Sequence, residues 1–363
     1  MAQRAAELMS ERPNDAAVRA DADRLARDAL ARDTTNVTAM RNRGLIADLN
    51  GNSNAARRWM RSAEAFSRRD PPTQLWLIED AVARGDIGQA LTHYDRALRT
   101  SKNAPELLFP VLIAASNDAS VADELSKRLA GRPNWWGPFV NRLIGETDNP
   151  AILVLFARRL GLSPNDREHP DFFGRILQRL VDANQVGRAD ALYRTIVSKG
   201  SQPLYNGDFE QDRGVLPFDW RLADESDLAA QISARPDGAK GQVLMLDARN
   251  GRGGEVAAQA VALKPGHYVL QGVAAHVSED ESARPVARIR CGPSREAELA
   301  ALRLPRAAAA PVAFALPFTL PARCSGAWIV IEANSDLGGH SDRPWLDNLR
   351  IVRMAPGSAT TAR

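Results

Sequence analysis

The sequence has no long uninterrupted apolar segment and no concentrated block of like charge. No apolar run approaches the roughly 18 residues that a membrane-spanning helix needs, and the first ten residues, MAQRAAELMS, lack the apolar centre of a signal peptide. The 47 basic and 44 acidic residues leave a net charge of only +3, and no five or six like charges adjoin, so a nucleic-acid-binding surface is not predicted. The first residues have the pattern of a helix from the middle of a helical array. We therefore expect an export signal or membrane anchor upstream of them. Any membrane attachment would come only through that segment.

The sequence also lacks the short motifs that identify common enzyme classes. It contains no Gly-x-Ser-x-Gly elbow, no phosphate-binding glycine loop ending in Lys-Ser or Lys-Thr, and no His-Glu-x-x-His. GRGGE at 251–255 is glycine-rich, but it precedes a strand-like run and reads as a hairpin loop. The five histidines are scattered, and no spacing pairs two carboxylates as a glycosidase requires. We therefore predict that the chain is not an enzyme.

Cysteine is scarce, and both cysteines fall in the C-terminal part of the chain. Cys291 and Cys324 each lie at the edge of a strand-like run, in RIRCGP and PARCSG. Two thiols without further ligands of suitable spacing favour a disulfide over a metal site; two buried free thiols are the alternative. A disulfide would contribute roughly 3 to 4 kcal/mol of stability. It would also indicate an oxidising compartment, the periplasm or the cell surface.

What the sequence does contain is a 34-residue interval in its N-terminal part. Small residues and prolines recur at this interval: Ala22, Ala56 and Ala90; Ala29, Ala63 and Ala97; Gly51 and Gly85; Pro71 and Pro105. Two helices approach closely only where a side chain is small, and glycine suits the turn between them. The interval therefore predicts stacked helix–turn–helix units. His93 shares the interval with Leu25 and Trp59, so we expect it in the core or in a groove.

These residues resemble the tetratricopeptide repeat family, most clearly over 73–103, which contains ARGDIGQALTHYDRAL. The resemblance implies a binding scaffold, an α-solenoid over residues 1–200 whose first helices line a concave groove for a protein partner. The residues that would face this groove are Asn42, Arg43, Gln74, Trp76 and Glu79. The alternative is that they are ordinary surface and inter-repeat residues.

The periodicity changes after residue 200. Residues 131–200 are helical by pattern but irregular, and 172–197 return to the helix–turn–helix form as a late or capping repeat. From Leu204 onward short alternating runs replace the helical pattern: QVLMLDA, EVAAQAVAL, HYVLQGVAAHV, ARIRC, PVAFALPFTL, AWIVIEA and LDNLRIV. They predict an antiparallel β-sandwich over 204–355, followed by a disordered tail at 356–363.

Four segments of the β part resemble carbohydrate-binding modules of the galactose-binding-like jelly-roll class: LYNGDFE, FDW, KPGHYVLQG and PWLDNLRIV. The resemblance implies that LYNGDFE, residues 204–210, opens the domain as a strand beside the last strand, with a structural calcium ion where the two meet. Glu210 and Asp347 match its ligand positions, and Asp208 and Asn348 are weaker candidates; Ca²⁺ requires six to eight oxygen ligands. The alternative is that Asp347 and Asn348 are turn residues and Glu210 a solvated charge.

Modules of this class stack sugar rings on exposed aromatic side chains. The aromatic residues available are Phe218, Trp220, Tyr268, Trp328 and Trp345. Trp220 and Trp328 lie in strand-like runs, which favours positions in the core. In AWIVIEA, however, Trp328 alternates with isoleucines, so the strand face that carries it would hold both apolar and charged residues. Trp345 follows a polar, glycine-rich stretch, so we expect it to be partly exposed, with 337–345 lining a ligand groove or simply forming a flexible loop.

The sequence thus predicts a multidomain α + β protein, an N-terminal α-solenoid followed by a jelly-roll β-sandwich. The favoured function is a non-catalytic scaffold of the bacterial envelope that holds a protein on its helices and a glycan on its strands. Both resemblances together fit the export or assembly of a surface polysaccharide. One alternative is a protein–protein adaptor whose β-sandwich only caps the solenoid. The other is an undetected carbohydrate-active enzyme, which would need two carboxylates in a deep pocket.

Overall fold

The computed structural model describes residues 1–197, 202–211, 214–335 and 343–354. The chain forms two compact units, Met1–Leu160 and Gly161–Arg363. The predicted tail at 356–363 and most of the predicted ligand loop at 337–345 lie outside the described residues. None of the described helices has the length and apolar character needed to cross a membrane.

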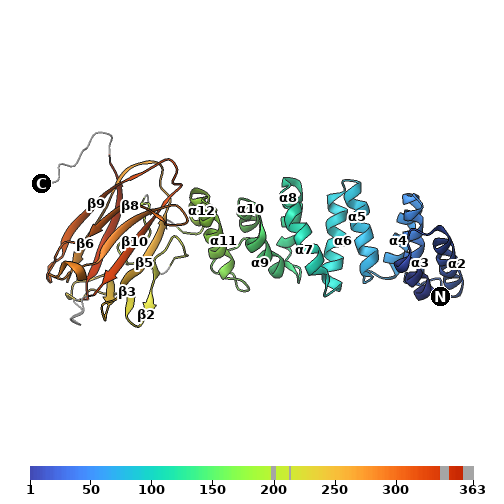
Figure 1. The fold of residues 1–363 in the computed structure, drawn as a ribbon, viewed down its shortest axis with the longest axis horizontal. Coiled ribbons are helices and arrows are strands. Elements are labelled where there is room, and N and C mark those ends of the chain that lie inside the picture. Colours follow the sequence, from blue (N-terminus) through green and yellow to red (C-terminus); the bar gives the residue numbers. More distant parts are fainter. Residues whose placement is uncertain (198–201, 212–213, 336–342, 355–363) are drawn as a thin grey trace. The chain divides into compact units, whose positions relative to one another are not determined.

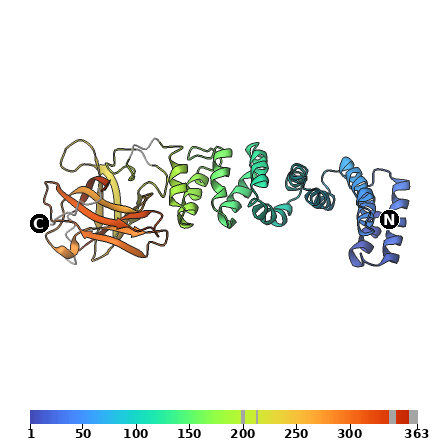
Figure 2. The ribbon, with the colours of Figure 1, turned by 90° about the horizontal axis from the view of Figure 1, so that it is seen from above.

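The first unit consists of ten helices that follow one another in pairs (Figures 1 and 2). They are α1 (Ala2–Glu11), α2 (Ala16–Arg32), α3 (Val37–Leu49), α4 (Ser53–Phe66), α5 (Pro71–Ala83), α6 (Ile87–Thr100), α7 (Ala104–Ala115), α8 (Ala119–Ala130), α9 (Trp136–Glu146) and α10 (Ile152–Arg159). Helices α3 and α5 begin 34 residues apart, and so do α4 and α6. The structure therefore confirms the interval and the helix pairs predicted from it.

Short polar side chains and glycines define the ends of these helices. A side-chain oxygen of the residue before the helix accepts a hydrogen bond from a backbone N–H at six helix starts: Asp15, Asn36, Asn52, Asp70, Asp86 and Asp118. Gly51 and Gly85 turn the chain between paired helices with φ of 76° and 70°, a conformation that strains other residues. The repeating alanines Ala22, Ala29, Ala56, Ala63, Ala90 and Ala97 are all buried.

The predicted groove residues lie mostly between the helices. Asn42 is buried and donates to the carbonyl of Ala2 at 3.0 Å. Gln74 is completely buried, and Trp76 is buried with its Nε1 donating to Asp48 at 3.0 Å. The prediction that these three residues face a partner is therefore wrong in this structure, because their polar groups are satisfied within the helical stack. The inter-repeat alternative describes them instead.

The other two predicted groove residues have more contact with solvent. Arg43 is half-buried, pairs with Asp23 at 3.0 Å, and lies with its guanidinium 4.4 Å from the Trp59 ring centroid. Glu79 is exposed on α5. A partner-binding role stays a prediction for both, with Glu79 the freer of the two to meet a partner.

A buried polar cluster joins α4, α5 and α6. His93 lies 3.0 Å from Gln74 and 3.1 Å from Glu64, and Arg96 also pairs with Glu64. Burial by itself would raise the pKa of Glu64, but the hydrogen bond and charge of His93, with Gln74 and Arg96, outweigh it and lower the pKa to about 2. His93 thus occupies one of the two predicted positions, the core.

We expect this cluster to make the free energy of unfolding depend on pH. A carboxylate whose pKa falls from 4.5 to about 2 on folding stabilises the fold above about pH 4.5 and loses that contribution as the pH falls towards 2. Glu64→Gln should therefore cost on the order of 2 kcal/mol at about pH 5.5 and almost nothing at about pH 2. Urea unfolding of the full chain, followed by helical circular dichroism, measures both values.

Glu79→Gln is the matched control, because Glu79 is an exposed glutamate on α5. It should change stability by less than about 0.5 kcal/mol at either pH. If Glu64→Gln cost the same at both pH values, the carboxylate would not be held ionised by His93 and Arg96.

The second unit begins with the helix pair α11 (Asp171–Asp182) and α12 (Val186–Tyr193) and continues as strands. The strands are β1 (Arg221–Leu222), β2 (Asp224–Glu225), β3 (Leu228–Ala234), β4 (Gln242–Ala248), β5 (Gly253–Val261), β6 (Gly266–Ala275), β7 (Val286–Cys291), β8 (Ala297–Arg303), β9 (Val312–Leu320), β10 (Ala327–Asn334) and β11 (Trp345–Arg353), with a 3₁₀ turn η1 (Glu281–Ala283). Sheet A has the order β1-β5-β10-β7-β8, and sheet B has the order β2-β3-β4-β11-β6-β9. All the paired strands in both sheets are antiparallel.

The two sheets share one hydrophobic core, which confirms the predicted β-sandwich. Alternate residues of the longer strands enter it, such as Ile329 and Ile331 of β10 and Leu244 and Leu246 of β4. Because successive side chains of a strand point to opposite faces, the residues between them form the outer faces of the sheets.

The segment that was predicted to open the sandwich as a strand does not form one. Residues 204–210 have no strand, and Asn206 and Phe209 have φ of 46° and 58°, which interrupts an extended chain. The segment still meets the last strand, because the Leu349 N–H donates to the Gly207 carbonyl at 2.7 Å. Phe209 enters the core, so the segment closes the sandwich without extending a sheet.

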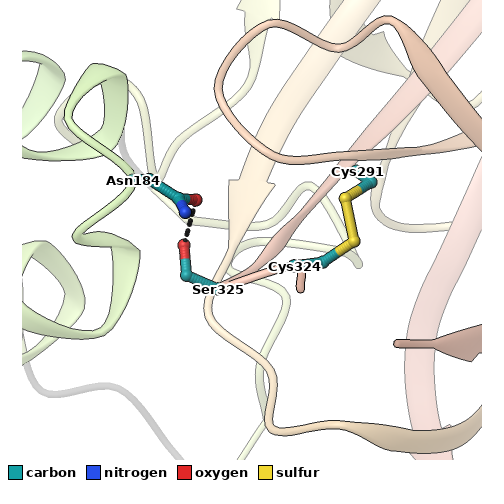
Figure 3. The surroundings of a disulfide bond; sticks show 4 residues. All are labelled: Asn184, Cys291, Cys324 and Ser325. Carbon is teal, nitrogen blue, oxygen red and sulfur yellow. Dashed lines mark hydrogen bonds between the residues drawn. A yellow bond between two sulfur atoms is a disulfide. The ribbon is translucent and has the colours of Figure 1, made fainter. Parts of the chain in front are cut away.

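A disulfide joins Cys291 and Cys324, with their Cα atoms 5.6 Å apart, as predicted (Figure 3). Cys291 ends β7, and Cys324 lies in the turn before β10 and is buried. The bond therefore fixes the start of β10 to the end of β7 and to the β7–β8 turn that follows.

The last helix pair packs on the sandwich next to this disulfide. Ser325 donates to the side-chain oxygen of Asn184 at 2.6 Å (Figure 3), and the Tyr193 ring lies 5.3 Å from the Phe218 ring. The last α-helix ends at Tyr193 and the first strand begins at Arg221, later than the predicted start of the β part at residue 204. The compact units, however, divide at Leu160, so that α11 and α12 belong to the unit of the strands.

Candidate functional site

The outer face of sheet A carries an aromatic ring surrounded by charged side chains. On β10, Ile329 and Ile331 enter the core, so Trp328 and Glu332 point outward. Trp328 lies opposite Arg290 of β7 and Ala260 of β5. This arrangement follows from alternation along three neighbouring strands.

An arginine from a distant turn covers the Trp328 ring. Arg295 lies in the β7–β8 turn with φ of 57°, and its guanidinium carbon is 3.5 Å from the ring centroid. The guanidinium of Arg221, on β1, is 6.0 Å away. Trp328 is consequently only 3% exposed, and Arg295 itself keeps 16% of its side chain exposed.

Carboxylates connect the arginines of this face. Glu255 of β5 accepts from Arg221 at 2.8 Å and from Arg295 at 2.9 Å. Glu332 of β10 pairs with Arg288 at 2.8 Å and with Arg290 at 3.4 Å, and Arg288 also pairs with Glu298 at 2.6 Å. We define the Trp328 face as this set: Arg221, Glu255, Arg288, Arg290, Arg295, Glu298, Trp328 and Glu332.

Burial and like charge both act on Arg295. Burial lowers the pKa of its guanidinium, the carboxylate of Glu255 raises it, and the neighbouring charges of Arg221 and Arg290 lower it further. The positive charge over the ring is therefore held at an electrostatic cost, which a negatively charged ligand would relieve.

Trp345 is the predicted stacking residue that the structure contradicts most clearly. It lies on the outer face of sheet B, beside Val243 and Ala275, but it is 0% exposed. The guanidinium of Arg235 lies 4.7 Å from its ring centroid. The expectation of partial exposure is wrong, because a long side chain from the end of β3 covers the ring.

Trp220 and Tyr268 are also buried, as core residues. The Nε1 of Trp220 donates to the Asn206 carbonyl at 3.0 Å, and the hydroxyl of Tyr268 donates to the Lys264 carbonyl at 2.7 Å. Phe218 is completely buried. None of these three rings offers a free face to a sugar in this structure.

The residues predicted to bind calcium do not fit that ion. Arg235 pairs with Asp347 at 2.8 Å, and Glu210 accepts from the backbone N–H of Gln242 at 2.6 Å. Asp208 is exposed, and Asn348 donates its own N–H to Asp347. Across residues 1–197, 202–211, 214–335 and 343–354, no group of three or more His, Cys, Asp or Glu side chains is placed to hold a metal. A guanidinium neutralises Asp347 where the resemblance implied a cation.

The pKa of Asp347 reflects this environment. Burial raises it, as does the charge of Glu210, and the charge of Arg235 acts in the opposite direction. The net direction is upward, so burial outweighs the stabilising contacts of the carboxylate.

A second polar hollow lies on sheet B. It has a volume of about 270 Å³ and is lined by Asp224, Ala229, Ala230, Gln231, Met245, Leu246, Asp247, Arg249 and Arg343. Its two carboxylates would be the residues of the enzyme alternative, but Asp247 is paired with Arg249 at 2.5 Å. Asp247 and Arg249 therefore already neutralise each other in this hollow.

The charged residues of the Trp328 face were not predicted from the sequence, and only some of them carry a signal. The alternation of ARIRC places Ile289 inward and Arg288 and Arg290 outward, which a strand pattern can indicate. Arg295 lies in a turn, 33 residues before Trp328. No sequence pattern links these two residues.

Comparison with known proteins finds similarity in fold only. No protein-family model and no curated protein matches the sequence. A family 61 carbohydrate-binding module in complex with β-1,4-galactotriose is 12% identical, with a TM-score of 0.31, over 43% of this chain and 100% of that one. The module of Cellvibrio mixtus lichenase 5A in complex with cellotriose is 14% identical, with a TM-score of 0.25, over 38% and 97%.

An enzyme domain is also similar. The enzymatically active domain of tailspike protein 4 from bacteriophage CBA120 is 16% identical, with a TM-score of 0.30, over 42% of this chain and 21% of that one. All three similarities have TM-scores below 0.5, so they do not decide what this chain binds or does. The likeness concerns the fold alone.

Proposed function

We propose that the chain is a non-catalytic scaffold of the bacterial envelope that binds a glycan on the Trp328 face. The observation that carries the proposal is an indole on the outer face of a sheet, with arginine and glutamate side chains around it. Sugars bind where an aromatic face is combined with a few polar groups that fix their orientation. The bound sugar ring takes the place of the Arg295 guanidinium on the indole.

The wider role follows from the remaining features. The Cys291–Cys324 disulfide is compatible with an oxidising compartment, which supports the periplasm or the cell surface. Helix pairs offer extended surfaces for a protein partner, and Glu79 is exposed on one of them. Together these features support a role in the export or assembly of a surface polysaccharide.

Calorimetric titration of the full chain tests glycan binding, with oligosaccharides first selected on a glycan array. Trp328→Ala should weaken binding at least tenfold, because it removes the stacking surface. Glu255→Gln should weaken binding of the same oligosaccharide about tenfold without leaving a cavity. Arg249→Gln, in the hollow on sheet B, is the control and should leave binding unchanged.

Three results would contradict the proposal: no binding by a folded chain, unchanged binding in both variants of the Trp328 face, or loss of binding only in Arg249→Gln. The last of these would move the site to sheet B. Circular dichroism of each variant shows whether it is folded.

The adaptor alternative has one observation in its favour. All four aromatic residues predicted to stack on a sugar, Trp220, Tyr268, Trp328 and Trp345, are at most 5% exposed. A chain that binds no glycan, with α11 and α12 held on the sandwich, would use its strands only as a structural cap.

A further inference from the structure

Two guanidinium groups lie against or near the Trp328 ring, and the residue paired with Trp328 on β7 is a third arginine. Arg295 covers the ring at 3.5 Å, Arg221 approaches it at 6.0 Å, and Arg290 lies directly opposite on β7. They come from a turn, an edge strand and an inner strand of sheet A. The folded sheet brings these three arginines into the region around Trp328.

These arginines have fewer acceptors than they could use. Arg221 and Arg295 share the carboxylate of Glu255. Arg290 reaches Glu332 only at 3.4 Å, and its buried Nε has no hydrogen-bond partner among the described residues. Over the whole Trp328 face four arginines stand against three glutamates, which leaves one positive charge.

We infer that the Trp328 face selects glycans that carry carboxylates, of the uronic acid class. This inference rests on the proposed function and names the substrate class of the same site. A planar carboxylate accepts two parallel hydrogen bonds from a guanidinium. A uronate bound over Trp328 places its ring on the indole and directs its carboxylate to one of the two flanking arginines, Arg290 or Arg221, and the displaced Arg295 remains within reach of the same charge.

The hollow on sheet B has no comparable charge excess. It combines Asp224 and Asp247 with Arg249 and Arg343, two charges of each sign, and Asp247 and Arg249 already form a pair. A neutral sugar on the Trp328 face would leave the surplus guanidinium without a counter-charge, whereas a uronate supplies one. Complementary charge gives specificity more than raw affinity, so the inference concerns selection between glycans.

Two oligosaccharides that differ only at C6 provide the test. The full chain is titrated calorimetrically with a β-1,4-linked tetramer of glucuronic acid and with cellotetraose, at low and at high sodium chloride. We expect the uronate to bind at least about tenfold more tightly at low salt, and its advantage to shrink at high salt because ions screen partly exposed charges. Arg290→Gln and Arg221→Gln should each remove most of this advantage, and Arg249→Gln should not.

The possible outcomes separate the two proposals. If both tetramers bound equally and without salt dependence, and binding were lost in Glu255→Gln, the glycan site would stand and the inference would be overturned. If neither bound, and the glycan array gave no ligand, the proposed function would be overturned as well. If Arg249→Gln removed the uronate preference and Arg290→Gln did not, the acidic site would lie on sheet B and the inference would be wrong.

Discussion

Reduction of the Cys291–Cys324 disulfide is expected to lower the free energy of unfolding of the second unit by roughly 3 to 4 kcal/mol. The bond closes a loop of 33 residues in sequence, and an unfolded chain freed from it gains the corresponding conformational entropy. In the folded state it ties the turn before β10 to the end of β7. The β7–β8 turn that carries Arg295 follows directly.

The measurement is urea unfolding of the full chain, oxidised and reduced, with hydrogen exchange read by mass spectrometry. Exchange should accelerate in β7, in β10 and in the Asn184 region, and should be unchanged in residues 1–160. Ser325→Ala is the control, because it removes only the hydrogen bond to Asn184 and should cost about 1 kcal/mol. Equal stability of the oxidised and reduced chains would show that the disulfide does not constrain this fold.

Gly207→Ala is expected to destabilise the same unit by about 3 kcal/mol. A Cβ atom at this position would lie 2.0 Å from the backbone oxygen of Leu349, and a backbone atom cannot rotate away as a side chain can. The hydrogen bond from the Leu349 N–H to the Gly207 carbonyl, 2.7 Å long, would be lost as the segments separate. Thermal and urea unfolding of the full chain measure the effect.

Gly187→Ala, in α12, provides the contrast. No atom lies within 4 Å of a Cβ built there, so this variant should be neutral or gain about 0.4 to 1 kcal/mol by restricting the unfolded chain. If the two variants were equally stable, close approach of the backbones at Gly207 would not be what closes the sandwich.

The secondary structure follows from sequence patterns that depend on neighbours along the chain. The 34-residue interval places α3, α4, α5 and α6, because small residues and turn glycines must recur wherever two helices meet. The runs QVLMLDA and AWIVIEA correspond to β4 and β10 because alternation reports a strand with one buried face. The predicted strand at 204–210 fails because two left-handed residues bend the chain, and β8, Ala297–Arg303, was not predicted because its residues are only partly buried.

The binding residues depend on contacts that no local pattern contains. In the folded strands Trp328 and Trp345 lie on outer faces, but the exposure of each ring depends on which side chains reach across it. In both cases a guanidinium from another part of the fold covers the indole, Arg295 on sheet A and Arg235 on sheet B. Arginine combines a long apolar stem with a flat cation that stacks on an aromatic ring, so one such side chain can bury a tryptophan that the strand pattern leaves outside.

The sequence by itself determined the helix pairs and most of the strands, because the periodicity that predicts them involves residues close together along the chain. It also determined the pairing of the two cysteines, because only two are present. The tertiary structure alone decided that Asn42, Gln74 and Trp76 bond within the helical stack and that Arg235 takes the place of a cation beside Asp347. It also decided that four arginines and three glutamates meet on the outer face of sheet A. Strand order brings these residues together from positions as far apart as 221 and 332, and strand order is set by packing of the whole core.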